Sequence, residues 1–201
     1  MENNFDSSKY DDKYYNWFVK NTKDYIKTTM DWFIDTYKPK SIIDYGCGIG
    51  AYLESGFNKG VERLQGFDIN GEILKKYTNP LIGKFITYTD CTEKINTDKY
   101  ECIISIETAE HINPLKSEVF VMNLINSADE NSLIIFSAAQ PEQNGTGHIN
   151  CQTKEFWIEL FNTYGFGVDS QVTKEVSEKW KTLKAPKYVY NNLIIFKKDD
   201  L

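Results

Sequence analysis

The chain contains the run SIIDYGCGIG at residues 41–50. Its first part is short, apolar and rich in β-branched residues, which predicts a buried strand. Three alternate glycines follow, and glycines permit positive φ angles and allow a ligand to lie directly on the backbone. Amides at a loop that precedes a helix can also bind a polar or charged group. The run therefore predicts a strand–loop–helix unit with a ligand site at the loop.

Strand and helix patterns alternate after this unit. Further strands are expected over residues 63–67, 84–88, 101–106, 132–137, 166–170 and 192–196, with helices between them that begin near Asn70, Asn113 and Thr153. Before the unit, aromatic residues at helical spacing predict one or two helices over residues 10–37, ended by Pro39. This alternation predicts an α/β fold, a doubly wound and mainly parallel Rossmann-like sheet of seven strands. Periodicity leaves the direction of the last strand open.

No repeat, linker or shift in composition divides the chain. We therefore expect one domain over residues 1–201, with an N-terminal helical cap over 1–38 and an α/β core over 39–201.

Composition and charge narrow the class of partner. The net charge is -6 and no run is rich in Lys or Arg, which argues against a nucleic-acid acceptor, because long nucleic acids are held by basic surfaces. A small-molecule acceptor is the simpler expectation. The four cysteines form no CxxC pair and predict free thiols in a reducing compartment. With a polar N-terminus and no apolar run of membrane-spanning length, the sequence predicts a cytoplasmic protein without a membrane span.

Three acidic residues follow or end the first three predicted strands. Gly46, Gly48 and Ala51 satisfy a relaxed dinucleotide-binding pattern, so the glycine loop alone leaves an NAD-type cofactor open. Asp44, however, stands two positions before the first glycine, where a pyrophosphate would gain nothing from a carboxylate. Asp68 ends the second strand, where it can accept both hydroxyls of a ribose, and Asp90 follows the third strand, where an adenine amino group could donate to it. Taken singly, Asp68 and Asp90 could also be solvated turn carboxylates or helix caps.

With these residues in place, the chain resembles the class I S-adenosylmethionine-dependent methyltransferases from about residue 40 onward. The resemblance rests on residues 44–50, 66–70, 90–91 and 105–112, in that order. It implies the Rossmann-like methyltransferase fold, S-adenosylmethionine as cofactor and transferase activity. The glycines would border the methionine and ribose parts, Asp68 the ribose, Asp90 the adenine, and the backbone near Ile106 and Glu107 the amino-acid end. The cofactor residues so implied are Asp44, Gly46, Gly48, Gly50, Asp68, Ile69, Asp90, Cys91, Ile106 and Glu107.

The acceptor is expected beside the loops that follow the fourth and fifth strands, and both histidines lie there. His148 belongs to a long polar loop, and an imidazole that changes protonation near neutral pH could accept a hydroxyl proton, so we predict it as the catalytic base. The alternative is that His148 and Asn150 only tie the loop down by hydrogen bonds before the helix that begins near Thr153. Other residues expected to bind the acceptor are Tyr14, Glu142, Gln143, Asn144 and His111, although His111 could instead support the helix start. Some sugar methyltransferases place a divalent ion against the acceptor hydroxyls, which leaves a metal open as the alternative. No HxxxH or paired-acid spacing specifies one here, so none is expected, and Glu110 is interpreted as a helix-start carboxylate.

A looser resemblance concerns the reaction. Residues 147–151 and 155–157 are similar to a group of small methyltransferases from glycan and natural-product pathways. This resemblance implies O-methylation of a small hydroxyl compound such as a nucleotide sugar. The alternatives are a methyltransferase acting on RNA or protein and a non-catalytic member of the fold that only binds the cofactor. A nicotinamide-dependent oxidoreductase is disfavoured because residues 107–111 offer no Tyr-x-x-x-Lys pair.

Overall fold

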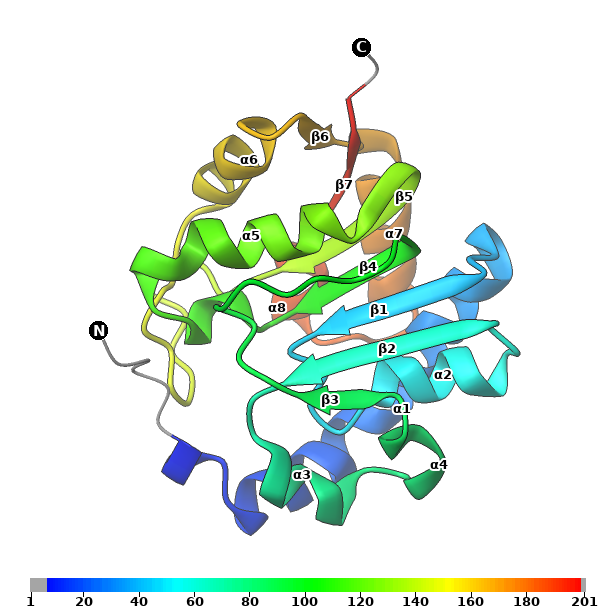
Figure 1. Cartoon of the computed structure of the whole chain (residues 1–201), viewed down its shortest axis with the longest axis vertical. Coiled ribbons are helices and arrows are strands. Elements are labelled where there is room, and N and C mark those ends of the chain that lie inside the picture. Colours follow the sequence, from blue (N-terminus) through cyan, green and yellow to red (C-terminus); the bar gives the residue numbers. More distant parts are fainter. Residues whose placement is uncertain (1–6, 200–201) are drawn as a thin grey trace.

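A seven-stranded sheet forms the centre of the protein (Figure 1), in a computed structural model that describes residues 7–199. Residues 1–6 of the expected N-terminal cap, and residues 200–201, lie outside the described part. The strand order is β3-β2-β1-β4-β5-β7-β6, and β7 runs antiparallel to β5 and β6 while the other neighbouring strands are parallel. The predicted mainly parallel seven-stranded sheet is therefore confirmed. The strands are β1 (Ser41–Tyr45), β2 (Arg63–Asp68), β3 (Ile86–Tyr88), β4 (Tyr100–Ile106), β5 (Ala128–Ser137), β6 (Phe166–Val168) and β7 (Ile194–Lys198).

Helices connect the strands at the predicted places. They are α1 (Asp12–Tyr37), α2 (Ala51–Asn58), α3 (Gly71–Tyr77), α4 (Pro80–Gly83), α5 (Ser117–Asn126), α6 (Lys154–Asn162), α7 (Ser170–Thr182) and α8 (Lys187–Asn192), with short 3-10 turns η1 (Ser7–Lys9), η2 (Ala109–His111) and η3 (Pro114–Lys116). The structure shortens the third predicted strand, because the Asn79 side chain caps a helical turn that starts at Pro80. The last strand likewise starts later, because α8 continues to Asn192.

Successive apolar side chains along each strand point to opposite faces of the sheet, and helices cover both faces. Ile42 packs into a core with α1, α2 and α7, whereas Ile43 faces a second core with α5 and α6. Figure 1 shows α5 and α6 on the near side of the sheet and α1 on the far side. The large side chains Trp180 and Trp157 anchor the two cores and are almost completely buried. Such a double layer holds the strand ends rigidly, which suits a site built on the loops that follow them.

Helix α1 is one continuous helix of 26 residues. The Asp11 side chain accepts a hydrogen bond from the backbone of Tyr14 and starts the helix, and Lys38 ends it in a left-handed conformation directly before Pro39. Its C-terminal half buries Met30 and Phe33 against the sheet, while its first turns reach past the carboxyl ends of the strands. None of the described helices is long and apolar enough to pass through a lipid bilayer.

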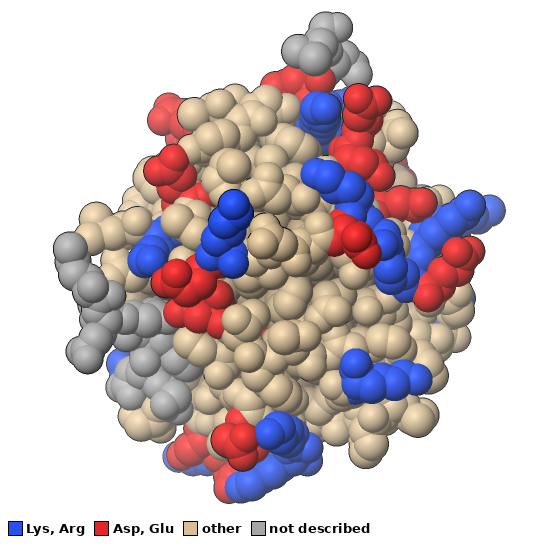
Figure 2. All heavy atoms as spheres, in the orientation of Figure 1, with Lys and Arg blue, Asp and Glu red and all other residues tan. Residues whose placement is uncertain are grey.

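The strand order reverses beside β1, because β2 lies on one side of it and β4 on the other. In open α/β sheets a ligand crevice forms at the carboxyl ends of the strands at such a reversal. On the face shown in Figure 2, acidic and basic side chains are interspersed and form no basic stripe.

Candidate active site

A cavity of about 630 Å³ opens at the carboxyl ends of β1, β2 and β4. The first turns of α1 form its other side, through residues such as Tyr14 and Phe18. Every predicted cofactor residue except Gly50 lines it, as do His111, Gln143, Asn144 and His148 from the predicted acceptor side. Both sets of predicted residues therefore face one space. We call Asp44, Gly46, Gly48, Asp68 and Asp90 the glycine wall, and Glu110, His111 and His148 the histidine wall.

The three glycines of the 46–50 loop all have positive φ angles, but they have different structural roles. A Cβ on Gly46 would lie 2.2 Å from the Thr108 side chain, so only glycine fits there. A Cβ on Gly48 would meet no atom within 4 Å, which leaves open space above the backbone for a ligand. Gly50 instead begins α2, and its Cβ position faces Ile82, away from the cavity lining. Gly50 is thus placed as a helix-start residue, not as the cofactor contact expected from the sequence.

Two buried carboxylates stand at the centre of the glycine wall. Asp44 is 2% exposed, and its Oδ2 atom has no hydrogen-bond partner among the described residues. Burial, reinforced by the nearby charge of Asp68, raises the pKa of Asp44 well above its usual range. Asp68 accepts hydrogen bonds from the backbone amides of Gly48 (2.8 Å) and Asn70 (2.9 Å). Burial raises the pKa of Asp68 although these bonds oppose the rise.

The third acid has a local role in shaping its loop. One oxygen of Asp90 accepts hydrogen bonds from the backbone amide and the hydroxyl of Thr92, at 2.8 and 2.7 Å. Asp90 and Cys91 nevertheless line the cavity at the end of β3. The turn-forming role considered for Asp90 is therefore present together with its place in the cavity wall.

Backbone hydrogen bonds bring the loop over residues 138–152 onto η2. The amides of Ile149 and Asn150 both donate to the carbonyl of Glu110, each at 2.9 Å. The buried Asn150 side chain donates to the Ala109 carbonyl at 3.1 Å and to the Ser117 hydroxyl at 3.0 Å. Asn150 therefore helps to tie this loop down, as the alternative to catalysis expected, and it does so beside His148.

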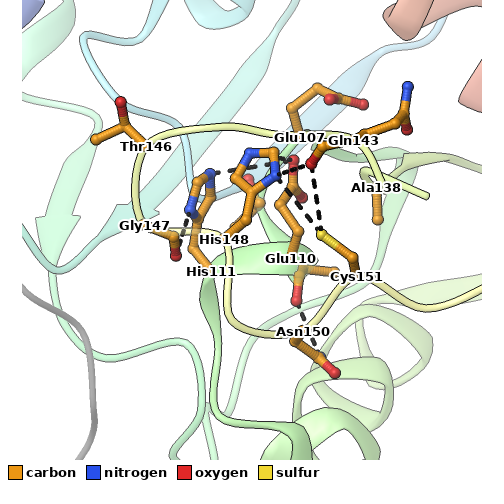
Figure 3. Close-up of polar contacts among 12 residues, drawn as sticks. Glu107, Glu110, His111, Ala138, Gln143, Thr146, Gly147, His148, Asn150 and Cys151 are labelled. Carbon is orange, nitrogen blue, oxygen red and sulfur yellow. Dashed lines mark hydrogen bonds and ion pairs between the residues drawn. The ribbon is translucent and has the colours of Figure 1, made fainter. Parts of the chain in front are cut away.

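The two imidazoles face each other in the histidine wall, with ring centres 5.0 Å apart (Figure 3). Nδ1 of His148 lies 3.0 Å from the carbonyl oxygen of Gln143, and Nδ1 of His111 lies 3.2 Å from that of Gly147. A carbonyl oxygen only accepts, so each Nδ1 atom carries the proton and each Nε2 atom carries a lone pair. Burial lowers the pKa of His111 to about 4, which keeps its ring neutral.

The remaining predicted acceptor residues are divided by the structure. Tyr14, Gln143 and Asn144 line the cavity, and burial raises the pKa of Tyr14 to about 12. Gln143 also accepts a hydrogen bond from the Asn192 side chain at 3.0 Å, which fixes its orientation. Glu142 is exposed, has a φ of 70°, and lies outside the cavity lining. The structure therefore does not bring Glu142 into the candidate site.

Glu110 and several tyrosines are site residues that sequence reasoning missed. Glu110 was interpreted as a helix-start carboxylate, but its side chain is completely buried and points toward the two imidazoles (Figure 3). Burial, reinforced by Glu107, raises the pKa of Glu110 well above its usual range. Tyr25 of α1 and Tyr52 of α2 line the cavity, as does Tyr188 of α8, which lies near the C-terminal end of the chain. Only the Glu-His pair at 110–111 offered a sequence signal, and that signal is ambiguous without the fold.

Comparison with known proteins identifies the fold. No family model matches the chain, and no curated protein matches it in sequence. Among solved structures, a S-adenosylmethionine-dependent methyltransferase from Archaeoglobus fulgidus is similar with a TM-score of 0.66 and 19% identity, over 93% of this chain and 100% of that one. A 1,6-didemethyltoxoflavin-N1-methyltransferase from Burkholderia thailandensis gives 0.65 and 11%, over 96% and 87%. The sugar N-methyltransferase KedS8 from Streptoalloteichus gives 0.67 and 7%, over 92% and 93%. The chain has the fold of these methyltransferases.

Proposed function

We propose that the chain is a S-adenosylmethionine-dependent methyltransferase that methylates a hydroxyl of a small molecule such as a nucleotide sugar. One observation carries this proposal. Three carboxylates and two glycines at positive φ form one wall of a single cavity, and that wall lies where the strand order reverses. A wall of this composition suits a ligand with an ammonium group, a ribose and an adenine better than it suits a pyrophosphate.

The residues present fit this cofactor. The unpaired Oδ2 atom of the buried Asp44 is an acceptor that lacks a donor, and an ammonium group would supply one. A carboxylate has about four lone-pair sites, so Asp68 keeps lone pairs for ribose hydroxyls beside the hydrogen bonds that it accepts from the amides of Gly48 and Asn70. The open space above Gly48 allows a ligand to lie on the loop. When bound, S-adenosylmethionine would supply a methyl group already activated for displacement.

The histidine wall is the proposed acceptor side. His148 is the predicted base, and its Nε2 lone pair is available within the cavity because Nδ1 donates to the Gln143 carbonyl. His111, Tyr14, Gln143 and Asn144 would surround the acceptor with donors and acceptors suited to hydroxyl groups. The net charge of -6 and the mixed charges in Figure 2 favour a small acceptor over a nucleic acid. Similarity to a fold used by a sugar N-methyltransferase is consistent with this choice.

Calorimetric titration with S-adenosylmethionine, S-adenosylhomocysteine and NAD tests the cofactor directly. We expect saturable one-to-one binding of the first two and none of NAD. Binding of NAD alone would contradict the proposal. A panel of nucleotide sugars then tests the acceptor, with methyl transfer followed by mass spectrometry. Transfer to a nitrogen, to a peptide or to RNA, with none to the sugars, would retain the methyltransferase and reject the hydroxyl acceptor. Binding without transfer to any acceptor would favour a non-catalytic protein.

A further inference from the structure

The histidine wall brings together three atoms that can each offer a lone pair to a ligand, namely Oε1 of Glu110 and the Nε2 atoms of His111 and His148. Nε2 of His111 lies 4.0 Å from Oε1 of Glu110, and Nε2 of His148 lies 3.9 Å from the same oxygen. Both distances are too long for hydrogen bonds. Each of the three side chains offers one potential ligand atom, and these three atoms lie within 4.8 Å of one another. Figure 3 shows the two rings converging on the carboxylate from the loop and from η2.

Glu110 is the residue that makes this arrangement unusual. Its side chain is completely buried, neither of its oxygens makes a well-formed hydrogen bond with the described residues, and the carboxyl group of Glu107 lies close enough to interact with it. A buried acceptor without a donor is costly, and more costly still when the group is charged. A second carboxylate, Glu107, faces it and disfavours its negative charge further. A cation placed between the carboxylate and the imidazoles would remove both penalties.

We propose that Glu110, His111 and His148 bind one divalent transition-metal ion through Oε1 and the two Nε2 atoms. With bonds of about 2.1 Å, typical of zinc with nitrogen or oxygen, two ligand atoms of a tetrahedral site lie about 3.4 Å apart. The separations of 3.9 and 4.0 Å exceed that value by about 0.5–0.6 Å. The limit of 4.8 Å for the group exceeds it by about 1.4 Å, so the three side chains close in around the ion by small rotations when it binds.

The surroundings of the imidazoles match those of metal ligands. A ligating histidine commonly donates its other ring N–H to a backbone carbonyl, which fixes the ring and its tautomer. Here the carbonyls of Gln143 and Gly147 take that role. Two imidazoles with one carboxylate suit zinc and neighbouring transition ions, whereas Mg²⁺ and Ca²⁺ prefer sites made of oxygen.

The three ligands leave room for a further one from the cavity, which all three residues line. Sites with three protein ligands and one open position are typical of catalytic metal ions. An acceptor hydroxyl in that position would be held next to the glycine wall, and the ion would lower the pKa of that hydroxyl. The metal site stands on the contacts above, and only this role rests on the proposed function. With the ion bound, Nε2 of His148 is a ligand and the base role proposed above falls away.

Zinc binding to the full chain tests the site without any need for turnover. The tag-free protein, dialysed against a chelator, is titrated with Zn²⁺ by calorimetry and with Co²⁺ by visible absorption, with Mg²⁺ as the comparison ion. We expect one tightly bound Zn²⁺ per chain. His148→Ala and Glu110→Gln should weaken binding by more than the roughly 10- to 100-fold that follows loss of an outer-shell partner.

Cys151→Ser is the matched control, because Sγ of Cys151 lies 3.6 Å from Nδ1 of His148 but is not one of the proposed ligand atoms. It should bind Zn²⁺ as the original chain does. His148 lies on a partly exposed loop, so the His148→Ala variant should fold. It therefore keeps the test decisive if Glu110→Gln does not fold. No bound Zn²⁺ in the original chain, or equal affinity in His148→Ala, would overturn the metal site. S-adenosylmethionine titration of the same samples separates the proposals: zinc without cofactor binding rejects only the proposed function, and the reverse rejects only the metal site.

Discussion

The glycine wall and the histidine wall face the same cavity, but contacts of different range assemble them. In the glycine wall, Asp68 accepts a hydrogen bond from Gly48 across one pair of adjacent parallel strands; Asp68 ends β2, and Gly48 lies in the loop that follows β1. In the histidine wall, the Tyr10 hydroxyl contacts His111, and the loop that contains His148 is held by hydrogen bonds to the backbone carbonyl of Glu110. The first wall is a direct product of the sheet, whereas the second depends on how one long loop lies. Substitutions should therefore affect the two walls separately.

The largest effect is expected from Gly46→Ala. Gly46 has a φ of 78°, and a new Cβ would lie 2.2 Å from Thr108. We expect the free energy of unfolding to fall by about 2–4 kcal/mol, because strain and overpacking add, and cofactor binding to be lost. Chemical denaturation measures the first and calorimetry the second. Gly60→Ala is the control, since its φ is 76° but its Cβ would meet nothing within 4 Å, so it should lose only about 1 kcal/mol. Equal losses in both variants would show that Thr108 simply moves aside.

Asp68→Asn should separate the two walls in binding. The amide keeps the shape of the side chain but loses the charge and one acceptor oxygen. We expect affinity for S-adenosylmethionine to fall roughly 10- to 100-fold, because hydrogen bonds to a charged group are worth about 1.5–3 kcal/mol. Zn²⁺ affinity should stay unchanged. Both are measured by calorimetry on one preparation, and unaltered cofactor affinity would remove Asp68 from the proposed ribose site.

Gly145→Ala should affect only the histidine wall. A Cβ on Gly145 would lie 2.1 Å from Nε2 of His148, so the imidazole must turn away. We expect Zn²⁺ affinity to fall about 10-fold, within the range seen when the support of a ligand is disturbed. Cofactor affinity should be retained. Gly83→Ala, whose Cβ would come no closer than 3.8 Å to any neighbour, is the control. A normal Zn²⁺ affinity in Gly145→Ala would show that the His148 ring adapts without cost.

The smallest effect is expected from Tyr10→Phe. The hydroxyl lies 3.0 Å from Nδ1 of His111 and donates to the Thr146 carbonyl at 3.0 Å, so it ties the start of α1 to the histidine wall. Its loss should cost about 1 kcal/mol of stability and change Zn²⁺ affinity no more than a few-fold. Thermal unfolding and calorimetry measure these changes. A loss as large as that in His148→Ala would make Tyr10 a necessary part of the site.

Much of the fold and of the glycine wall could be predicted because their signals are local. Apolar runs of strand length, caps such as Asn113 and Thr153, and the glycine loop each act within a few residues. Once the strands are parallel, their carboxyl ends meet at one edge, so Asp44, Asp68 and Asp90 must lie near one another. Gly50 was misplaced because alternating glycines look alike in sequence, while the structure gives each a different neighbour.

The sequence by itself determined the alternation of strands and helices, the mainly parallel sheet and the acidic, glycine-rich edge, because each follows from local conformational preference and from hydrophobic burial. Only the tertiary structure decided that β7 is antiparallel, that Glu142 stays outside, and that Glu110 turns inward to two imidazoles. The positions of Glu142 and Glu110 depend on the path of residues 138–152 and on backbone hydrogen bonds between residues about forty positions apart. No local pattern encodes such contacts, since their free energy appears only when the loop and η2 are already packed together.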